Sequence, residues 1–298
     1  MIYRETGNFV TNYLKDRQII NLSFDKYFLI VFLLIMLFYV PTMSEYALSA
    51  HIIPILAVGL ATLGLNILTG LTGQLSLGTA GFMSVGAFAT YNLLLRLPED
   101  LMSLPFALLI GGIFSGLVGV IFGLPAAKIK GFYLLVSTLA AQYFVWWFFN
   151  SYAWFLNYES SGVVALPPRM YDYWGLGSFL GIDMQAYGPR YVLAFLICLG
   201  LTYFAFNLMR SNTGRSFMSV RDRDIAAGVI GIPVVKTKML AFFISCFYCG
   251  VAGGLYCFAY IGNVDLMIFE IDRSFTILFM VIIGGLGSIT GSWLGAIF

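Results

Sequence analysis

Charged residues are scarce in this chain. Asp, Glu, Lys and Arg make up 10% of its 298 residues, whereas hydrophobic residues make up 60% and the mean hydropathy is +0.90. A soluble globular domain is usually about one quarter charged. The deficit excludes an ordinary soluble domain and predicts an all-α integral membrane protein. A net charge of only +2 gives no basis for a nucleic-acid partner.

Groups that carry catalysis or bind metal are also few. The chain has one histidine, His51, and four cysteines, all inside apolar runs. Cys246 and Cys249 have the spacing of half a redox or zinc motif, but no second pair accompanies them, so packing residues are the better interpretation. No Gly-Lys dipeptide occurs, which excludes a Walker A loop. We therefore predict no catalytic residues, no metal site and no cofactor.

Apolar runs long enough to cross a bilayer, about 20 residues each, recur along the chain. We predict eight transmembrane segments, at about 27–43, 48–68, 74–95, 102–124, 131–150, 191–209, 239–260 and 274–298. They form a single polytopic domain over 27–298, after an N-terminal segment, 1–26. No cleavage pattern follows the first run, so we expect it to be an uncleaved anchor.

The distribution of Lys and Arg indicates the orientation. With a cytoplasmic N-terminus, Arg96, Arg169, Arg190 and Arg273 lie outside, which leaves twelve of the sixteen basic residues inside. Segment 1–26 and loop 210–238 are then cytoplasmic, and loop 151–189 is external. The external loop is rich in Tyr and Trp (Tyr152, Trp154, Tyr158, Tyr171, Tyr173, Trp174). These aromatics fit either a lipid interface or a surface for an external partner.

Loop 210–238 holds the densest charge of the chain, in the stretch GRSFMSVRDRDIAAGVIGIP. Arg215, Arg221, Asp222, Arg223 and Asp224 fall within ten residues there. Each charge at the centre of a membrane helix would cost about 2.5–3.5 kcal/mol. The stretch must therefore lie in water.

The same stretch predicts one helix over Ser216–Ile230, because it contains no proline until Pro233. Such a helix has an apolar stripe (Phe217, Val220, Ile225, Val229) and a small surface at Ala226, Ala227 and Gly228. Two interpretations are open: a helix that docks in a groove of another protein, or a solvated connector.

Two segments are rich in glycine, LTGQLSLGTAG (71–81) and IIGGLGSITGSWLG (282–295). Glycines allow helices to pack closely, and they also allow helix breaks that line a transport pathway; both interpretations are open. The candidate pathway residues are Gly70, Gly73, Gln74, Ser76, Gly78, Gly284, Gly285, Gly287 and Ser288.

Four ordered blocks resemble the branched-chain amino-acid permease family of ABC transporters, most closely its LivM type. They are GLNILTGLTGQLSLGTAGFMSVGAFA, GRSFMSVRDRDIAAGVIGI, AFFISCFYCGVAGGLYCFAY and IGGLGSITGSWLGA. The chain departs from the family at Thr79, where many relatives have His, and at Ile225, where the broader importer motif has Glu. Relatives usually continue past the point of Phe298, and whether this chain continues is left open.

The resemblance implies a function. It implies the membrane permease subunit of an importer in the bacterial inner membrane, with ATP hydrolysed on two separate cytoplasmic ATPase subunits. Its further partners would be a homologous permease and a periplasmic or extracellular solute-binding protein. The resemblance, together with the small surface described above, gives a set of candidate residues for coupling to the ATPase. They are Arg215, Arg221, Asp222, Asp224, Ala226, Ala227, Gly228 and Gly231.

Alternatives remain open for both the substrate and the transport mechanism. The family carries branched-chain amino acids, and relatives carry urea or short amides. An ATP-independent carrier or channel is the runner-up; it is disfavoured because 102–124, 191–209, 239–260 and 274–298 contain no Asp, Glu, Lys or Arg. An intramembrane enzyme is third, since no His, Asp or Glu cluster lies within a span.

Overall fold

The structure is a computed structural model that describes residues 23–98, 103–128, 132–159, 162–166 and 186–298. The chain divides into two units, Met1–Met43 and Ser44–Phe298. Most of the predicted N-terminal segment and part of the predicted external loop, with Tyr171, Tyr173 and Trp174, lie outside the described residues.

The first unit contributes one helical segment. Helix α2 (Ser23–Leu34) runs into a π-helical turn, η1 (Ile35–Tyr39), and a 3-10 turn, η2 (Val40–Thr42). Pro41 lies in η2, close to the end of the helical segment, which stops at Thr42. The segment covers most of the predicted span 27–43.

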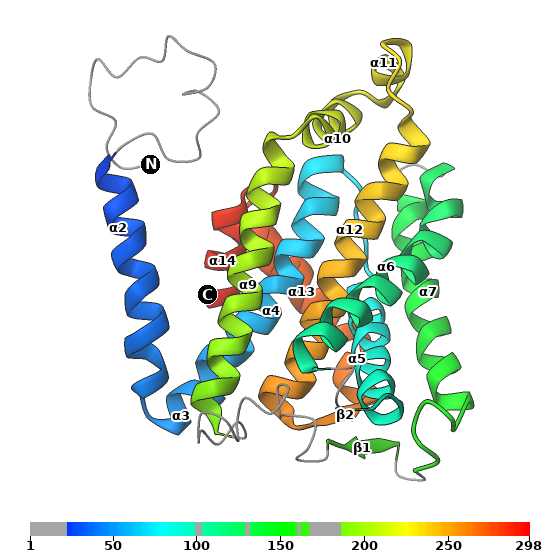
Figure 1. Ribbon diagram of the computed structural model, residues 1–298. Coiled ribbons are helices and arrows are strands. Elements are labelled where there is room, and N and C mark those ends of the chain that lie inside the picture. The colour runs from blue at the N-terminus through cyan, green and yellow to red at the C-terminus, as the bar shows by residue number, and fades with distance from the viewer. Residues whose placement is uncertain (1–22, 99–102, 129–131, 160–161, 167–185) are drawn as a thin grey trace. The chain divides into compact units, whose positions relative to one another are not determined.

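The second unit consists of packed helices and one short strand pair (Figure 1). Its elements are α3 (Glu45–Ala47), η3 (Leu48–Ile52), α4 (Ile53–Asn66), η4 (Ile67–Leu71), α5 (Thr79–Arg96), α6 (Leu104–Lys128), α7 (Phe132–Ser151), β1 (Val163–Ala165), α9 (Tyr187–Arg210), α10 (Asn212–Asp222), α11 (Asp224–Val229), α12 (Val234–Leu255), η6 (Tyr256–Ile261), β2 (Asn263–Asp265), η7 (Leu266–Phe269), α13 (Ile271–Gly284) and α14 (Ile289–Ile297).

Helix α12 is the centre of this unit, with α4, α5 and α6 packed against it. It is apolar on all sides and buried along most of its length, as expected for an interior helix. Gly86 of α5 lies so close to Gly250 of α12 that a side chain at position 86 would overlap the Gly250 backbone. Small residues allow this approach.

Hydroxyl groups join the helices in the apolar interior. The Ser115 hydroxyl on α6 donates to the carbonyl oxygens of Phe82 (2.7 Å) and Cys246 (2.9 Å), on α5 and α12. The Tyr248 hydroxyl donates to the Leu201 carbonyl of α9 at 2.7 Å. Such bonds satisfy polar groups that no water can reach.

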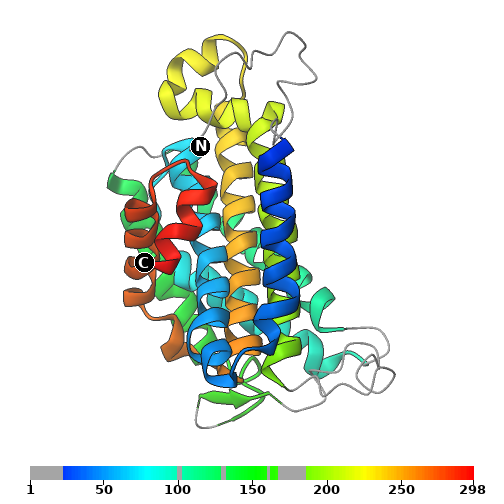
Figure 2. The same cartoon turned by 90° about the vertical axis from the view of Figure 1, so that its left-hand side faces the viewer.

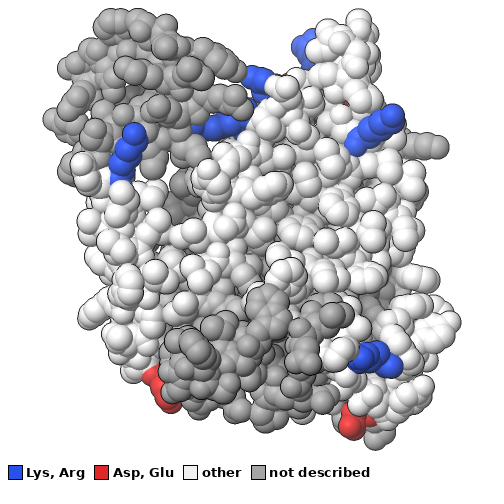
Figure 3. Space-filling view, viewed as in Figure 1, with Lys and Arg blue, Asp and Glu red and all other residues white. Residues whose placement is uncertain are grey.

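Four helical segments among the described residues are long and apolar enough to cross a membrane: Glu45–Leu71, Leu104–Leu124, Tyr187–Arg210 and Val234–Ile261. They match four of the predicted spans, and the total of eight stays a prediction. The helical architecture with membrane-type segments is confirmed. On the face of the second unit shown in Figure 3, the visible charged side chains lie near its two ends, and the surface between them is uncharged.

The β1–β2 pair was not predicted. Val163 lies opposite Asp265 and Ala165 opposite Asn263, in an antiparallel register. Strands of three residues carry too little alternation to be detected in a sequence. The pair attaches part of the predicted external loop to the turn after η6. It lies at the end of the unit opposite α10 and α11 in both views (Figures 1 and 2).

The predicted span 274–298 is two helices rather than one. Helix α13 ends at Gly284, and α14 begins after Ser288. Between them Gly285 and Gly287 have φ angles of +96° and +82°, which are incompatible with a continuing right-handed helix.

The predicted span 74–95 begins later than expected, at Thr79. The chain leaves the preceding helical segment at Gly73, whose φ is +69°. Residues 74–78 are therefore extended or bent rather than helical.

The predicted single helix Ser216–Ile230 is wrong. Helices α10 and α11 are separated at Arg223, whose backbone is extended (φ −155°, ψ 101°). The break lets Phe217 and Val220 of α10 pack into the chain while α11 points its aliphatic side chains elsewhere. The predicted apolar stripe therefore does not form one surface.

Candidate functional site

The first glycine break, 73–78, is held by side chains from helices distant in sequence. The Leu77 N–H donates to the Thr138 hydroxyl of α7 at 3.0 Å. A side chain at Gly78 would meet the Thr138 carbonyl at 2.7 Å. Next to it, the Ala80 N–H donates to the Ser274 hydroxyl of α13 (2.9 Å), which also hydrogen-bonds with the Gln142 carboxamide (2.7 Å).

Gln74 in this segment is unusual. Its residue is 5% exposed, and neither atom of its carboxamide has a hydrogen-bond partner among the described residues. A buried amide without partners is costly, by about 1–3 kcal/mol. The Gln74 carboxamide therefore has unmet hydrogen-bonding capacity within the described part of the chain. Ser76, also buried, accepts from the Gly78 N–H at 3.3 Å.

The second break, at Gly285–Ser288, folds α14 back against α13. A side chain at Gly284 would overlap the Gly291 carbonyl of α14. The Ser288 hydroxyl accepts from the Gly291 N–H at 3.0 Å and so caps the start of α14. Gly285 itself faces open space, so only its backbone angle requires glycine.

Asn66, the last residue of α4, is bonded to the second break. Its carboxamide nitrogen donates to the Ser288 carbonyl (2.8 Å) and to the Ser292 hydroxyl (2.7 Å), and its oxygen accepts from the Gly287 N–H (2.8 Å). A side chain at Gly70 would overlap the Gly287 backbone nitrogen. One amide thus joins the end of the first helical segment to the second break.

Helices α10 and α11 form the candidate coupling segment. Phe217 and Val220 anchor α10 in the chain, with Phe217 fully buried. On α11 and just after it, Ile225, Val229 and Ile230 are 75%, 84% and 73% exposed. Exposed aliphatic side chains grouped in this way, beside charged ones, are typical of contact surfaces.

The small surface predicted at Ala226–Gly228 is only partly present. Ala226 and Gly228 are exposed, but Ala227 is 2% exposed and lies inside the chain. The reason is the helical turn of α11, which directs residue 227 toward the chain while residues 225 and 229 face outward. The exposed face of α11 is therefore aliphatic rather than small.

An open cavity of about 670 Å³ lies between the coupling segment and the first break. Its lining includes Gly73 and Gln74 from one side and Arg221, Asp222, Asp224 and Ala226 from the other. Lys238 also lines it and forms an ion pair with Asp224 at 3.7 Å. The cavity thus brings two predicted pathway residues together with four predicted coupling residues.

The other predicted coupling residues do not line this cavity. Arg215 hydrogen-bonds with Asn212 on its own helix. Gly231, with φ of +90°, terminates α11, and the Ile232 N–H donates back to the Ala227 carbonyl at 3.0 Å.

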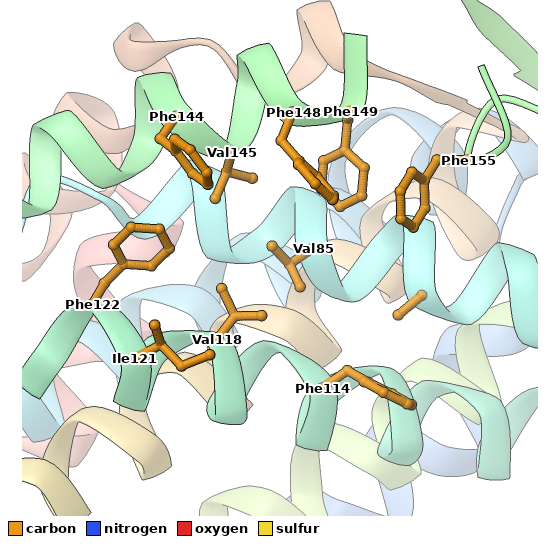
Figure 4. A pocket seen from close by; sticks show the side chains of 11 residues that line it. Val85, Phe114, Val118, Ile121, Phe122, Phe144, Val145, Phe148, Phe149 and Phe155 are labelled. Carbon is orange, nitrogen blue, oxygen red and sulfur yellow. The ribbon is translucent and has the colours of Figure 1, made fainter. Parts of the chain in front are cut away.

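A second cavity, of about 330 Å³, lies among α5, α6 and α7 (Figure 4). Its lining is almost entirely aliphatic and aromatic, including Phe114, Phe122, Phe144 and Phe148. It offers no donor or acceptor side chain that could orient a polar solute.

Sequence reasoning missed Asn66, Thr138, Gln142 and Ser274. A signal existed for Asn66, because an amide in an otherwise apolar span needs internal partners. The other three are hydroxyl and amide side chains whose partners lie far away in the sequence, so no local pattern identifies them.

Comparison with known proteins agrees with the four sequence blocks. A family described as the branched-chain amino acid transport system / permease component matches residues 47–298. Two relatives, both high-affinity branched-chain amino acid transport system permease proteins LivM, come from Salmonella typhimurium and Escherichia coli. Each is 29% identical over 250 residues, which cover 76% of this chain and 56% of the relative.

The chain therefore spans about half the length of the curated relatives it matches. No solved structure matches it. The resemblance predicted from the sequence blocks is confirmed, since the family match extends over the whole second unit except its first few residues. The chain belongs to the branched-chain amino acid transport permeases, a family of membrane transport components rather than enzymes.

Proposed function

We propose that the chain is the membrane permease subunit of an ATP-driven ABC importer in the bacterial inner membrane. Its substrates would be branched-chain or related amino acids, the cargo that the names of both LivM relatives state. Urea and short amides are the alternative substrates. ATP would be hydrolysed on two cytoplasmic ATPase subunits.

The observation that carries the proposal is the exposed aliphatic face of α11, which we call the α11 face: Ile225, Val229 and Ile230. It sits on a charged loop at the end of the unit opposite the β1–β2 pair (Figure 2). Lipid would not cover a surface beside Asp222 and Arg223, because these charges require water or polar partners. A groove on a soluble protein would suit both features.

The proposed importer has two further kinds of partner. A homologous permease would complete the pathway, and an external binding protein would deliver the solute. The two broken segments would contribute to the pathway, because broken helices in transporters expose backbone groups to a cavity. Gln74 is the side chain best placed to meet a polar solute, because its buried amide has no partner within the described chain.

The test replaces Ile225 and Val229 together by Glu and purifies the permease with its ATPase. Two charges in an apolar contact should reduce ATPase co-purification by about tenfold or more, with loss of leucine uptake. Membrane insertion should be unchanged, because both residues are exposed. The matched control is Asn212→Glu, which adds an acid at the exposed first position of α10. A negative charge there interacts favourably with the helix dipole.

Wild-type amounts of bound ATPase and wild-type uptake in the double variant would contradict the proposal. Uptake without any ATPase in the wild-type preparation would favour the carrier or channel. Competition of labelled leucine uptake by valine, isoleucine or urea would then separate the substrate classes.

A further inference from the structure

The Arg221 side chain is 41% exposed, but its guanidinium reaches toward the glycine breaks. Its guanidinium nitrogen Nη1 donates to the Gly70 carbonyl at 2.9 Å. Its Nε donates to Asp222 at 3.1 Å, so the neighbouring carboxylate orients the guanidinium. These are two specific contacts for one side chain at the edge of the molecule.

The Gly70 carbonyl is a natural acceptor for a cation. The helical segment that begins at α4 ends in η4, and the last carbonyl groups of a helix lack partners within it. They also form the negative end of the helix dipole, which favours Lys or Arg. Arg221, distant in sequence, thus caps the end of this segment.

The cap reaches both breaks. A side chain at Gly73 would meet Cγ of Arg221 at 3.1 Å, so the Arg221 stem lies directly against the first break. A side chain at Gly287 would lie 3.7 Å from Arg221 Nη1, so the guanidinium lies beside the second. Asn66 then joins Gly287 and Ser288 to the same helix end.

Arg221 belongs to α10, and α10 is anchored in the chain by its buried side chains. Val220, which precedes Arg221, is buried, and Phe217 is buried one turn earlier. The coupling segment therefore cannot move relative to the helix end without moving or breaking the contact between Arg221 and Gly70.

We infer that Arg221 is a positioning residue that links the coupling segment to both glycine breaks, so that movement of α10 on the ATPase is transmitted to the pathway. The inference rests on the proposed function, because it assigns a role to the ATPase-facing loop. It differs from the role of a charge that contacts the ATPase, since Arg221 would be needed for transport and not for docking.

The experiment uses Arg221→Met in the full permease, purified with its ATPase and reconstituted in vesicles. Methionine keeps an unbranched apolar stem but removes the donor. We expect bound ATPase and ATP hydrolysis near wild-type levels. Solute transported per ATP hydrolysed should fall by about tenfold or more, in line with the loss of a hydrogen bond from a charged donor. Arg221→Lys, which retains a cation, should recover part of this loss.

The matched control is Arg223→Met, which removes one positive charge from the same loop. Arg223 is exposed, in the extended backbone between α10 and α11. It should leave the transport-to-hydrolysis ratio unchanged. Backbone hydrogen exchange at 69–78 and 285–289 should rise in Arg221→Met and not in Arg223→Met, and this measurement does not depend on ATPase activity.

Three outcomes would overturn the inference: a wild-type transport-to-hydrolysis ratio in Arg221→Met, loss of bound ATPase in that variant, or unchanged hydrogen exchange at both breaks. The proposed function fails differently, through absence of the ATPase from the wild-type preparation. In that case the exchange comparison still decides whether Arg221 holds the two breaks.

Discussion

Helices α10 and α11 are adjacent in sequence but differ in whether their apolar side chains are buried or exposed. Helix α10 buries its apolar side chains in its own chain, and Phe217 is fully covered. Helix α11 leaves Ile225 and Val229 exposed and buries only Ala227. The backbone break at Arg223 separates the two behaviours. One helix attaches the loop to the membrane unit, and the other presents a surface.

The comparison teaches that an apolar stripe in a sequence need not be one surface. Phe217, Val220, Ile225 and Val229 have helical spacing, but one extended residue between them changes the direction of the chain. Substitutions on the two helices should therefore have different consequences, and the following predictions test that difference.

The largest effect is expected at Phe217→Asp. A carboxylate would replace a fully buried ring without a partner, a change that costs several kcal/mol and removes the packing of α10. The yield of monodisperse protein in size-exclusion chromatography should fall about tenfold or more, because the membrane unit loses its connection to the loop. The control is Ser216→Asp, at the half-buried residue next to Phe217, and it should preserve the yield. Normal yield in Phe217→Asp would mean that α10 is not an anchor.

An intermediate effect is expected at Ala227→Glu. The side chain would have to enter the contact between α11 and the rest of the chain, so α11 itself should be displaced. The melting temperature should fall by a few degrees, about 1–3 kcal/mol in stability, and ATPase binding should fall with it. The double variant of Ile225 and Val229 should lose ATPase binding without a fall in melting temperature. Equal melting temperatures in the two variants would remove the distinction between the buried and exposed sides of α11.

The smallest effect is expected at Gly228→Ala. A methyl group there would contact only Val234, at 3.9 Å, and the backbone angle does not require glycine. Alanine favours the helix by about 0.5–1 kcal/mol, so α11 should become slightly more stable. Hydrogen exchange of α11 should slow, with ATPase binding unchanged. A loss of ATPase binding would show that the partner approaches Gly228 closely and that the contact surface extends beyond the α11 face.

The membrane-type composition and the long apolar helices could be predicted from the sequence; the placement of loop 210–238 in water stays a prediction. These properties depend on local apolar length and local charge, which a single stretch reveals. The breaks at Gly73 and Gly285 were foreseen only as one of two interpretations. Glycine permits both close packing and positive φ angles, and composition cannot separate them.

The direction of Arg221 could not be predicted. It was grouped with the coupling residues through the resemblance to the permease family, yet its guanidinium bonds to a carbonyl 151 positions earlier. A contact of that range is determined by the packing of Phe217 and by the end of a π-helical turn. Neither feature can be detected from the spacing of nearby residues in the sequence.

Gly287 and Gly285 stand two residues apart in the turn between α13 and α14, and they are held in different ways. The Gly287 N–H donates to Asn66, and its backbone lies so close to Gly70 that a side chain at position 70 would overlap it, so the ends of the two segments must move together or lose these contacts. Gly285 has nothing within 4 Å of the position a side chain would occupy, and its backbone angle, φ +96°, is what requires glycine there. Because α13 and α14 also pack backbone to backbone at Gly284 and Gly291, the two helices and the turn between them form one compact hairpin, and Asn66 ties this hairpin to the end of α4.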